Sequence, residues 1–260
     1  MKRLIAIGDL HCGHYGGLTP PRYQVSNERR PKLHKLQVEG WNKFSNMAIK
    51  AIDTDSEIIL LVNGDAIDGN MHPNEMIVCD RREQCHMAEE CISKFNPAQL
   101  IMTRGTPVHV GKEEDWEDTI ARELGGDIRS EQFINIEGYR VYARHKIGRS
   151  NIPHGKNTSL SRKKIWNELK AAWKLEPHAD LLLFSHVHYC EGNFSFFGER
   201  KVSSMTLPAL QTVSQYGIKE CEGIVHFGLV YFDIEDGKLV KQTELIEIVD
   251  SACPTEIVIT

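Results

Sequence analysis

Five short apolar runs, each followed closely by an acidic residue or a histidine, constrain the fold of this chain more than any other feature. The runs are rich in isoleucine, leucine and valine, as are strands buried on both faces of a sheet. They cover residues 4–7, 58–62, 100–102, 139–143 and 181–184. Between them, apolar residues at three-to-four spacing predict helices over 32–53, 74–95, 115–124 and 159–175. This alternation of strand and helix favours an α/β fold.

The last third of the chain has a different pattern. Apolar segments joined by turns such as Asp236-Gly237 predict antiparallel strands at 194–197, 202–207, 224–234 and 239–248. No repeat, low-complexity tract or linker marks a domain boundary. We therefore expect residues 1–260 to form a single domain in which residues 190–260 complete a second sheet.

Charge and cysteine content limit the partners and the compartment. The 260-residue chain has 31 Lys and Arg against 36 Asp and Glu, a formal net charge of −5. This balance argues against binding nucleic acid or an anionic membrane through bulk charge, although it leaves room for a local basic groove. The 7 cysteines include no Cys-x-x-Cys pair, and no apolar run is long enough for an export signal or a membrane span. We expect reduced thiols and a cytoplasmic protein with no membrane partner.

Residues able to bind a metal follow the predicted strands of the first two thirds. Because the loops beyond the carboxyl ends of strands in an open α/β sheet converge on one crevice, residues far apart in sequence can meet there. The motifs, in chain order, are Asp9-Leu10-His11, Gly64-Asp65-Ala66-Ile67-Asp68, Gly105-Thr106-Pro107-Val108-His109, Arg144-His145 and His186-Val187-His188.

Each motif alone has an ordinary explanation. An Asp-x-His pair often has no function, and Gly-Asp-x-x-Asp is common in turns and helix caps. His-x-His is more specific, since alternating side chains place His186 and His188 on the same side of an extended segment. All five motifs, in this order and at strand ends, favour a metal centre.

The order of the five motifs resembles that of the calcineurin-like metallophosphoesterase superfamily, over the two thirds of the chain from Asp9 to His188. The resemblance implies a four-layer α/β/β/α sandwich with a two-metal centre at one edge. It implies that Asp9, His11 and His188 hold the first metal, that His145 and His186 hold the second, and that Asp65 bridges both. It further implies that His109 protonates the leaving oxygen or stabilises the transition state, and that Asp68 orients His109.

The ligand chemistry agrees with a two-metal hydrolase. Two cations roughly 3.5–4 Å apart neutralise the charge that develops in phosphoryl transfer to water. Imidazole together with carboxylate suits Mn, Fe, Zn or Ni better than Mg or Ca, which prefer oxygen ligands. We expect two divalent ions, with Mn as the first choice.

The third motif departs from the family pattern, which is usually Gly-Asn-His followed by an acid. Thr106 stands at the Asn position, and His109 comes two residues late, a form that resembles phage-type members. Either the Thr106 hydroxyl or a water takes the place of the Asn ligand. Glu113 or Glu114 is a candidate for the trailing acid, although both are equally suited to capping the next helix.

Three further residues are candidates for contact with metal or substrate. His14 lies in a glycine-rich loop, and Arg149 and His154 precede a basic stretch that includes Arg162. The alternatives are an exposed loop histidine and a solvated helix start. In the functional reading, the basic residues form a rim that binds phosphates.

The sequence therefore predicts a metal-dependent hydrolase of phosphoester bonds. We favour a phosphodiesterase or nuclease acting on nucleic acid or nucleotides. The alternatives are a phosphomonoesterase acting on phosphoprotein or a small metabolite, and a metal-binding scaffold of the same fold with weakened catalysis. The sequence leaves the natural substrate and the oligomeric state open.

Overall fold

The computed structural model describes residues 1–70, 72–111, 115–148, 150, 152, 155–212 and 224–250, with only the backbone of 224, 249 and 250 described. The strands are β1 Lys2–Ile7, β2 Glu57–Asn63, β3 Gln99–Thr103, β4 Asp127–Arg129, β5 Glu131–Ile136, β6 Tyr139–Lys146, β7 Leu181–Ser185, β8 Glu191–Phe197, β9 Arg200–Thr206, β10 Ile224–Glu235 and β11 Lys238–Asp250. The α-helices are α1 Pro31–Ile52, α2 Arg81–Ser93, α3 Pro107–Val110, α4 Trp116–Leu124 and α5 Lys156–Ala172, and short 3-10 helices cover Pro21–Tyr23 and Pro73–Glu75.

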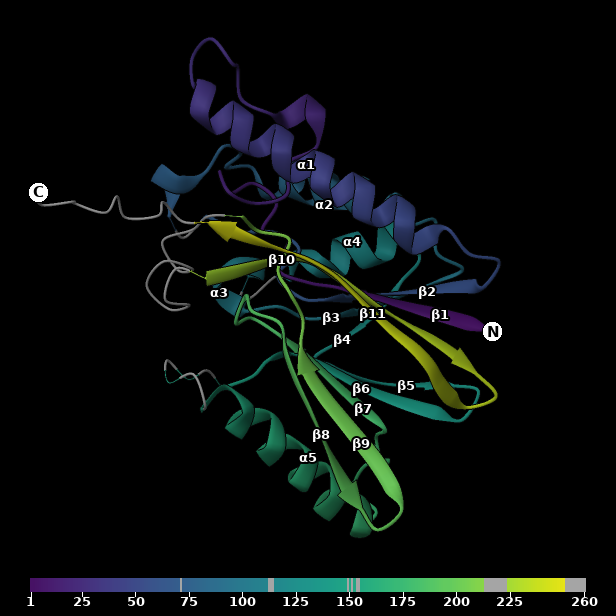
Figure 1. Ribbon diagram of the computed structural model, residues 1–260. Coiled ribbons are helices and arrows are strands. Elements are labelled where there is room, and N and C mark those ends of the chain that lie inside the picture. The colour runs from purple at the N-terminus through teal and green to yellow at the C-terminus, as the bar shows by residue number, and fades with distance from the viewer. Residues whose placement is uncertain are drawn as a thin grey trace, which may run out of the picture.

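Two mixed sheets pack face to face between helices (Figure 1). The six-stranded sheet has the order β11-β10-β1-β2-β3-β4, and the five-stranded sheet has the order β5-β6-β7-β9-β8. Helices α1, α2 and α4 cover the first sheet, and α5 covers the second (Figure 1). The structure thus has the predicted four-layer α/β/β/α architecture.

Side chains that alternate along the strands build the layers. In β1, Ile5 and Ile7 belong to the core beneath α1 and α2, whereas Leu4 and Ala6 belong to the core between the sheets. A third core, which includes Leu160 of α5, lies on the outer face of the second sheet. Because inner strands are buried on both faces, they read as continuous apolar runs in the sequence.

The predicted helix over 74–95 is too long at its start. The helix begins at Arg81, because the side chain of Asp80 caps it by accepting a hydrogen bond of 2.9 Å from the backbone N–H of Glu83. Residues Pro73–Glu75 form a separate 3-10 helix. Strands β4 and β5, which precede the predicted strand at 139–143, were not predicted from the sequence.

The expectation that residues 190–260 complete the second sheet is wrong for half of the segment. Strands β8 and β9 join the second sheet, but β10 pairs antiparallel with β1 and, with β11, forms the edge of the first sheet. A run of antiparallel strands reveals its hairpins but not which open sheet edge it joins. Residues 251–260 lie outside the described residues.

None of the described helices is long and apolar enough to cross a membrane.

Candidate metal centre

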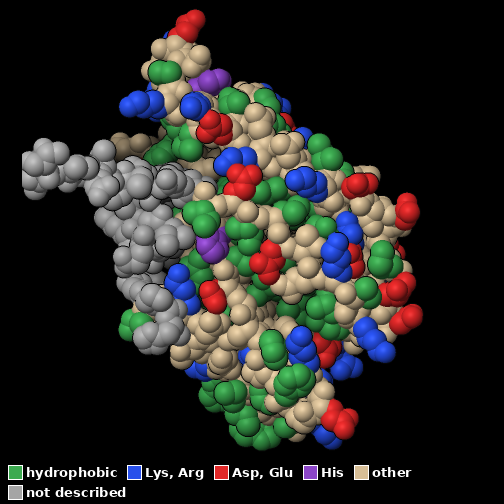
Figure 2. Space-filling model, in the orientation of Figure 1, with side chains coloured by type: hydrophobic (Ala, Val, Ile, Leu, Met, Phe, Trp, Pro, Cys, Tyr) green, Lys and Arg blue, Asp and Glu red, His purple; other side chains and the backbone are tan. Residues whose placement is uncertain are grey.

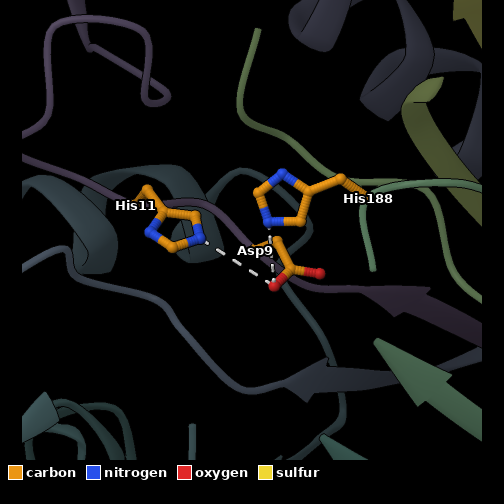
Figure 3. A group of neighbouring side chains, drawn as sticks. All are labelled: Asp9, His11 and His188. Carbon is orange, nitrogen blue, oxygen red and sulfur yellow. Dashed lines mark ion pairs between the residues drawn. The ribbon is translucent and has the colours of Figure 1, made fainter. Parts of the chain in front are cut away.

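Asp9, His11 and His188 form one group of potential ligands, in loops that follow β1 and β7. The Nε2 atom of His188 lies 3.5 Å from Oδ1 of Asp9, and Nε2 of His11 lies 3.9 Å from the same oxygen. Both rings direct a nitrogen toward this carboxylate (Figure 3). All three residues are buried. The sequence-predicted first set of ligands is therefore brought together.

Asp65, His145 and His186 form a second group beside the first. Nε2 of His145 lies 2.9 Å from Oδ2 of Asp65 and 4.0 Å from Oδ1 of Asp9, so the two groups adjoin. These residues follow β2, β6 and β7, whose carboxyl ends meet at one edge of the sandwich. The predicted second set is thus also brought together, whereas the bridging role of Asp65 stays a prediction.

The backbone at the potential ligands is strained. A positive φ costs a residue other than glycine about 1–3 kcal/mol and persists where the surrounding structure enforces it, often at functional sites. Five of the six predicted ligands have one: Asp9 (51°), His11 (45°), Asp65 (52°), His186 (76°) and His188 (54°). The loops are locked to each other, since the N–H of Asp9 donates to the carbonyl of Gly64 and the N–H of His11 to that of Asp65, both at 3.0 Å.

Hydrogen bonds on the far side of two rings fix which nitrogen can bind a metal. Nδ1 of His11 lies 2.7 Å from Oδ1 of Asp68, and Nδ1 of His145 lies 2.8 Å from the carbonyl oxygen of Asn63. Both partners only accept, so Nδ1 carries a proton in each ring and Nε2 is the nitrogen left for a metal. Ligand histidines are commonly oriented in this way.

The Asp68 carboxylate has a different partner from the one expected. It was predicted to orient His109, but its Oδ1 lies 3.6 Å from Nδ1 of His109 and much closer to His11. His109 instead donates from Nδ1 to the backbone carbonyl of Asp68, at 2.9 Å. The late position of His109 puts it in the short helix α3, and its ring packs edge-on against that of His11 with centroids 4.7 Å apart.

Thr106 lies in the middle of the second group. Its backbone N–H donates to Oδ1 of Asp65 at 2.5 Å, and its hydroxyl lies 3.1 Å from Oδ2 of Asp65. The hydroxyl is also 3.3 Å from Nε2 of His145 and 3.4 Å from Nδ1 of His186. The hydroxyl oxygen therefore sits where the resemblance places a neutral oxygen ligand.

The electrostatics of the site favour two ionised carboxylates. Burial by itself would raise the pKa of Asp9 and of Asp65, but the facing histidines, His188 for Asp9 and His145 for Asp65, hold both values below the usual range. Burial likewise opposes a charged His145, yet the charge and hydrogen bond of Asp65 raise its pKa to about 10. Burial and the neighbouring His145 lower the pKa of His186 to about 4.

Two residues that the sequence analysis missed hold the site together. Glu117 of α4 is fully buried, and its carboxylate accepts hydrogen bonds from the N–H groups of Ala66 (2.9 Å) and Gly105 (2.7 Å). These amides flank Asp65 and Thr106, so Glu117 joins the two loops. Burial first, and then the charge of Asp65, raises the pKa of Glu117 to about 8. A glutamate within an acidic helix gives no sequence signal for this role.

Asn63 connects four strand ends. Its side-chain amide donates to Ser185 Oγ (2.8 Å) and to the carbonyl of Arg144 (3.3 Å), and its Oδ1 accepts from Thr103 Oγ1 (2.7 Å). Its backbone carbonyl accepts from His145. Its place directly before Gly64-Asp65 was the available signal, because a polar residue that ends an apolar run often satisfies buried groups.

Close approach explains a glycine in the third motif. A Cβ atom on Gly105 would collide with the carboxylate and backbone of Asp65. Any side chain at position 105 would therefore displace the third-motif loop from the second ligand group.

The residues present fit a bound metal ion. Among the described residues, Oδ1 of Asp9 and Nε2 of His11 are buried without a hydrogen-bond partner. Burying such atoms is costly unless something compensates them. A cation coordinated by both would do so. Imidazole and carboxylate donors, with no cysteine in either group, suit transition-metal ions.

The three additional candidates have different outcomes. His14 is buried, its Nδ1 accepts from the N–H of Gly16 (3.0 Å), and its Nε2 lies 3.2 Å from Glu75. The alternative of an exposed loop histidine is therefore wrong for His14, and its contact with metal or substrate stays a prediction. Arg149 and His154 lie outside the described residues, as do Glu113 and Glu114.

No protein-family model matches the chain, and a search of curated proteins finds no significant match. Several solved structures are similar. A novel archaeal phosphodiesterase is 13% identical, with a TM-score of 0.44 over 93% of this chain and 99% of that one. The Zn²⁺ complex of Vps29 from Entamoeba histolytica is 11% identical, with a TM-score of 0.43 over 95% and 98%. A 5'-nucleotidase precursor from Thermus thermophilus is 9% identical, with a TM-score of 0.41 over 96% of this chain and 54% of that one.

At these identities the matches concern the fold alone. The ligand groups of this chain carry the functional argument. Its layered fold and the placement of its five motifs agree with the resemblance to calcineurin-like metallophosphoesterases.

Proposed function

We propose that this protein is a hydrolase of phosphoester bonds that depends on two divalent metal ions, and that its substrates are phosphodiesters of nucleic acid or nucleotides. The observation that carries the proposal is the pair of adjoining groups, Asp9-His11-His188 and Asp65-His145-His186, built from the ends of strands in both sheets. Paired groups of this kind are suited to in-line displacement at phosphorus.

Six side chains would hold the ions, with Thr106 offering a neutral oxygen to the second. Bound there, two divalent ions of the Mn type would supply Lewis-acid stabilisation of charge on the phosphoryl oxygens. Hydrogen bonds and charges within the protein orient the ligands before a metal binds. Hydrogen bonds to Asp68 and to the Asn63 carbonyl occupy Nδ1 of His11 and His145, so Nε2 is the nitrogen that faces the metal site in each ring. The facing histidines keep Asp9 and Asp65 ionised.

His109 is the proposed source of the proton for the leaving oxygen. Its Nδ1 is committed as a donor to the Asp68 carbonyl, so Nε2 is the nitrogen that gains and loses a proton. The side chain is 21% exposed, in contrast to its buried neighbour His11, so substrate can reach it. Glu117 and Gly105 act only through the loops that place Asp65.

A lysine that contacts the residue after His188 supports a polyanionic substrate. Lys156, at the start of α5, lies with its Nζ 4.4 Å above the ring of Tyr189, which directly follows His188. Such a cation fits a phosphate beyond the scissile one. Among the described residues, Lys156 is the feature that favours a phosphodiester within a longer polyanion over a small phosphomonoester.

Hydrolysis of chromogenic esters tests the proposal. The Mn-loaded protein is expected to hydrolyse bis-p-nitrophenyl phosphate, and His145→Ala should abolish this activity. His86→Ala is the matched control, because His86 is an exposed histidine of α2 outside both ligand groups. Turnover of p-nitrophenyl phosphate alone would establish a phosphomonoesterase instead. Bound metal without turnover of either ester would favour the scaffold with weakened catalysis.

A further inference from the structure

Strand β8 forms an open edge of the five-stranded sheet. Among the strands that the structure describes, it pairs with β9 alone. An edge strand presents a row of unsatisfied backbone groups, and proteins usually block it with charges, prolines or bulges. Between Gly192 and Phe197, β8 has no charged residue and no proline, and its register with β9 contains no bulge. Nothing in the strand therefore opposes pairing with another strand.

The direction of the free backbone groups follows from one hydrogen bond. The N–H of Glu191 donates to Thr206 Oγ1 of β9 at 3.1 Å, so the amide of Glu191 faces β9. Backbone groups alternate in direction along an antiparallel pair. The N–H and C=O groups of Gly192, Phe194 and Phe196 therefore point away from β9, to the open edge.

The side chains of the same three residues share one face, which is apolar apart from Lys201 of β9, whose Nζ lies 4.7 Å from the centre of the Phe194 ring. The side chains of Phe194 and Phe196 are 58% and 64% exposed, although both are large aromatic residues. Their rings contact each other edge-on, with centroids 5.8 Å apart. Figure 2 shows hydrophobic side chains gathered in the lower part of the molecule, over α5 and the β8–β9 hairpin.

Helix α5 extends this apolar surface on the other face of the strand. Asn157 and Ser161 of α5 contact Asn193 of β8 through hydrogen bonds of 3.0 and 3.1 Å. Continuing in steps of four residues, the same row reaches Ile165 and Leu169, which are exposed. Each step turns the row by about 40° away from the sheet. Ile165 therefore projects beside the open edge of β8, whereas Leu169 faces away from the sheet.

We propose that a second copy of this chain covers this surface, through antiparallel pairing of β8 with β8 of that copy about a two-fold axis. An antiparallel strand pair of one sequence is self-complementary, as a closed dimer requires. With the axis at Phe194, the midpoint of the strand, Phe194 lies opposite its own copy and Phe196 lies opposite Gly192. An aromatic side chain over a glycine is a favourable cross-strand arrangement.

The second helix completes the interface. A strand edge alone would bury less than the roughly 1,600 Å² of a standard interface. The two-fold axis also brings Ile165 of one copy toward Ile165 of the other, across the paired strands. Each half thus contributes an edge, an aromatic pair and part of an apolar helix face, and the two five-stranded sheets become one continuous sheet.

The oligomeric state of the wild type, compared with that of variants at the β8 edge, tests the proposal. The wild-type protein should be dimeric by light scattering across a dilution series. Phe194→Asp, which places two like charges opposite each other at the axis, should make it monomeric with an unchanged circular dichroism spectrum. Val240→Asp is the matched control, because Val240 is a 60% exposed apolar residue of β11, the edge of the other sheet. It should remain dimeric. A monomeric wild type, or a dimer that survives Phe194→Asp, overturns the proposal.

A cross-link tests the register without relying on a destabilising variant. Opposite residues of a hydrogen-bonded antiparallel pair have Cα atoms about 5.5 Å apart, which suits a disulfide. In a background in which Cys79, Cys221 and Cys253 are serine, Phe194→Cys should form a covalent dimer on oxidation. Cys190 can stay, because burial raises the pKa of its thiol to about 12. Cross-linking by Val240→Cys but not by Phe194→Cys would place the interface elsewhere and refute the pairing.

Discussion

Asp68 holds His11 through its carboxylate and His109 through its backbone carbonyl, at 2.7 and 2.9 Å. One residue thus positions both a candidate metal ligand and the candidate proton donor. The carboxylate bond keeps the proton of His11 on Nδ1, which leaves Nε2 free for the metal. The second Asp of the Gly-Asp-x-x-Asp motif therefore supports the metal centre and the proton donor at once.

Asp68→Asn is expected to lower metal affinity ten- to a hundredfold, since loss of an outer carboxylate has effects of about this size. The bond from His109 to the backbone carbonyl should persist in the variant. Titration with Mn, followed by calorimetry, measures the change. Asp236→Asn, in the exposed β10–β11 turn, is the control and should bind Mn as the wild type does. Equal Mn affinity in both variants would remove Asp68 from the metal centre.

His109→Ala is expected to lose turnover while it keeps its metals. Positioned proton transfer contributes about 10²–10⁴-fold to rate, and His109 lies outside the two groups of predicted ligands. The rate on bis-p-nitrophenyl phosphate should fall by about that factor, and elemental analysis should find the wild-type metal content. If turnover is unchanged, another group supplies the proton.

Metal binding should release a proton from His145. Its pKa of about 10 in the metal-free protein means that the ring is protonated at pH 7, whereas His186, with a pKa of about 4, is already neutral. A ligand histidine must be deprotonated, so Mn displaces the proton of His145 and apparent affinity rises about tenfold per pH unit below pH 10. Calorimetry in buffers of different ionisation enthalpy should find that Mn binding to His145→Asn releases about one proton fewer than Mn binding to the wild type. Equal proton release would contradict this assignment.

Glu117 should make the metal-free protein less stable as pH rises. Its folded pKa of about 8 lies above the ordinary 4.5, so the folded state binds more protons than the unfolded state between these values. The free energy of unfolding should therefore fall as pH rises from about 4.5 to 8 and then level off. In urea unfolding with a chelator present, the free energy of unfolding of Glu117→Gln should not show this decrease with pH. The same slope in both proteins would show that Glu117 does not titrate in this range.

The sequence predicted the parts of the site that depend on local pattern. Asp9, Asp65 and His186 each come two or three residues after the end of a buried apolar run, so their place at a sheet edge follows from strand geometry. It did not predict that Glu117 would join two loops. Such contacts depend on side chains that only packing brings together. Hydrophobic periodicity carries no information about these contacts.

The fold shows the same division. The strand at 139–143 was predicted, but its antiparallel neighbour β5 was not, and β10 was placed in the wrong sheet. Half-exposed edge strands carry a weak apolar signal, and the choice between two open sheet edges is made by long-range packing rather than by the strand itself.

The metal content and diesterase rate of Asp65→Asn test the central claim most directly. Asp65 belongs to the second group, with His145 at 2.9 Å and Thr106 donating to it twice, and its proposed role is to bridge both ions. The wild-type protein is expected to bind two Mn ions per chain and to hydrolyse bis-p-nitrophenyl phosphate. The variant should bind fewer ions and have no measurable turnover, because the proposed bridging residue has lost its charge. A fully loaded and active Asp65→Asn variant would contradict the account.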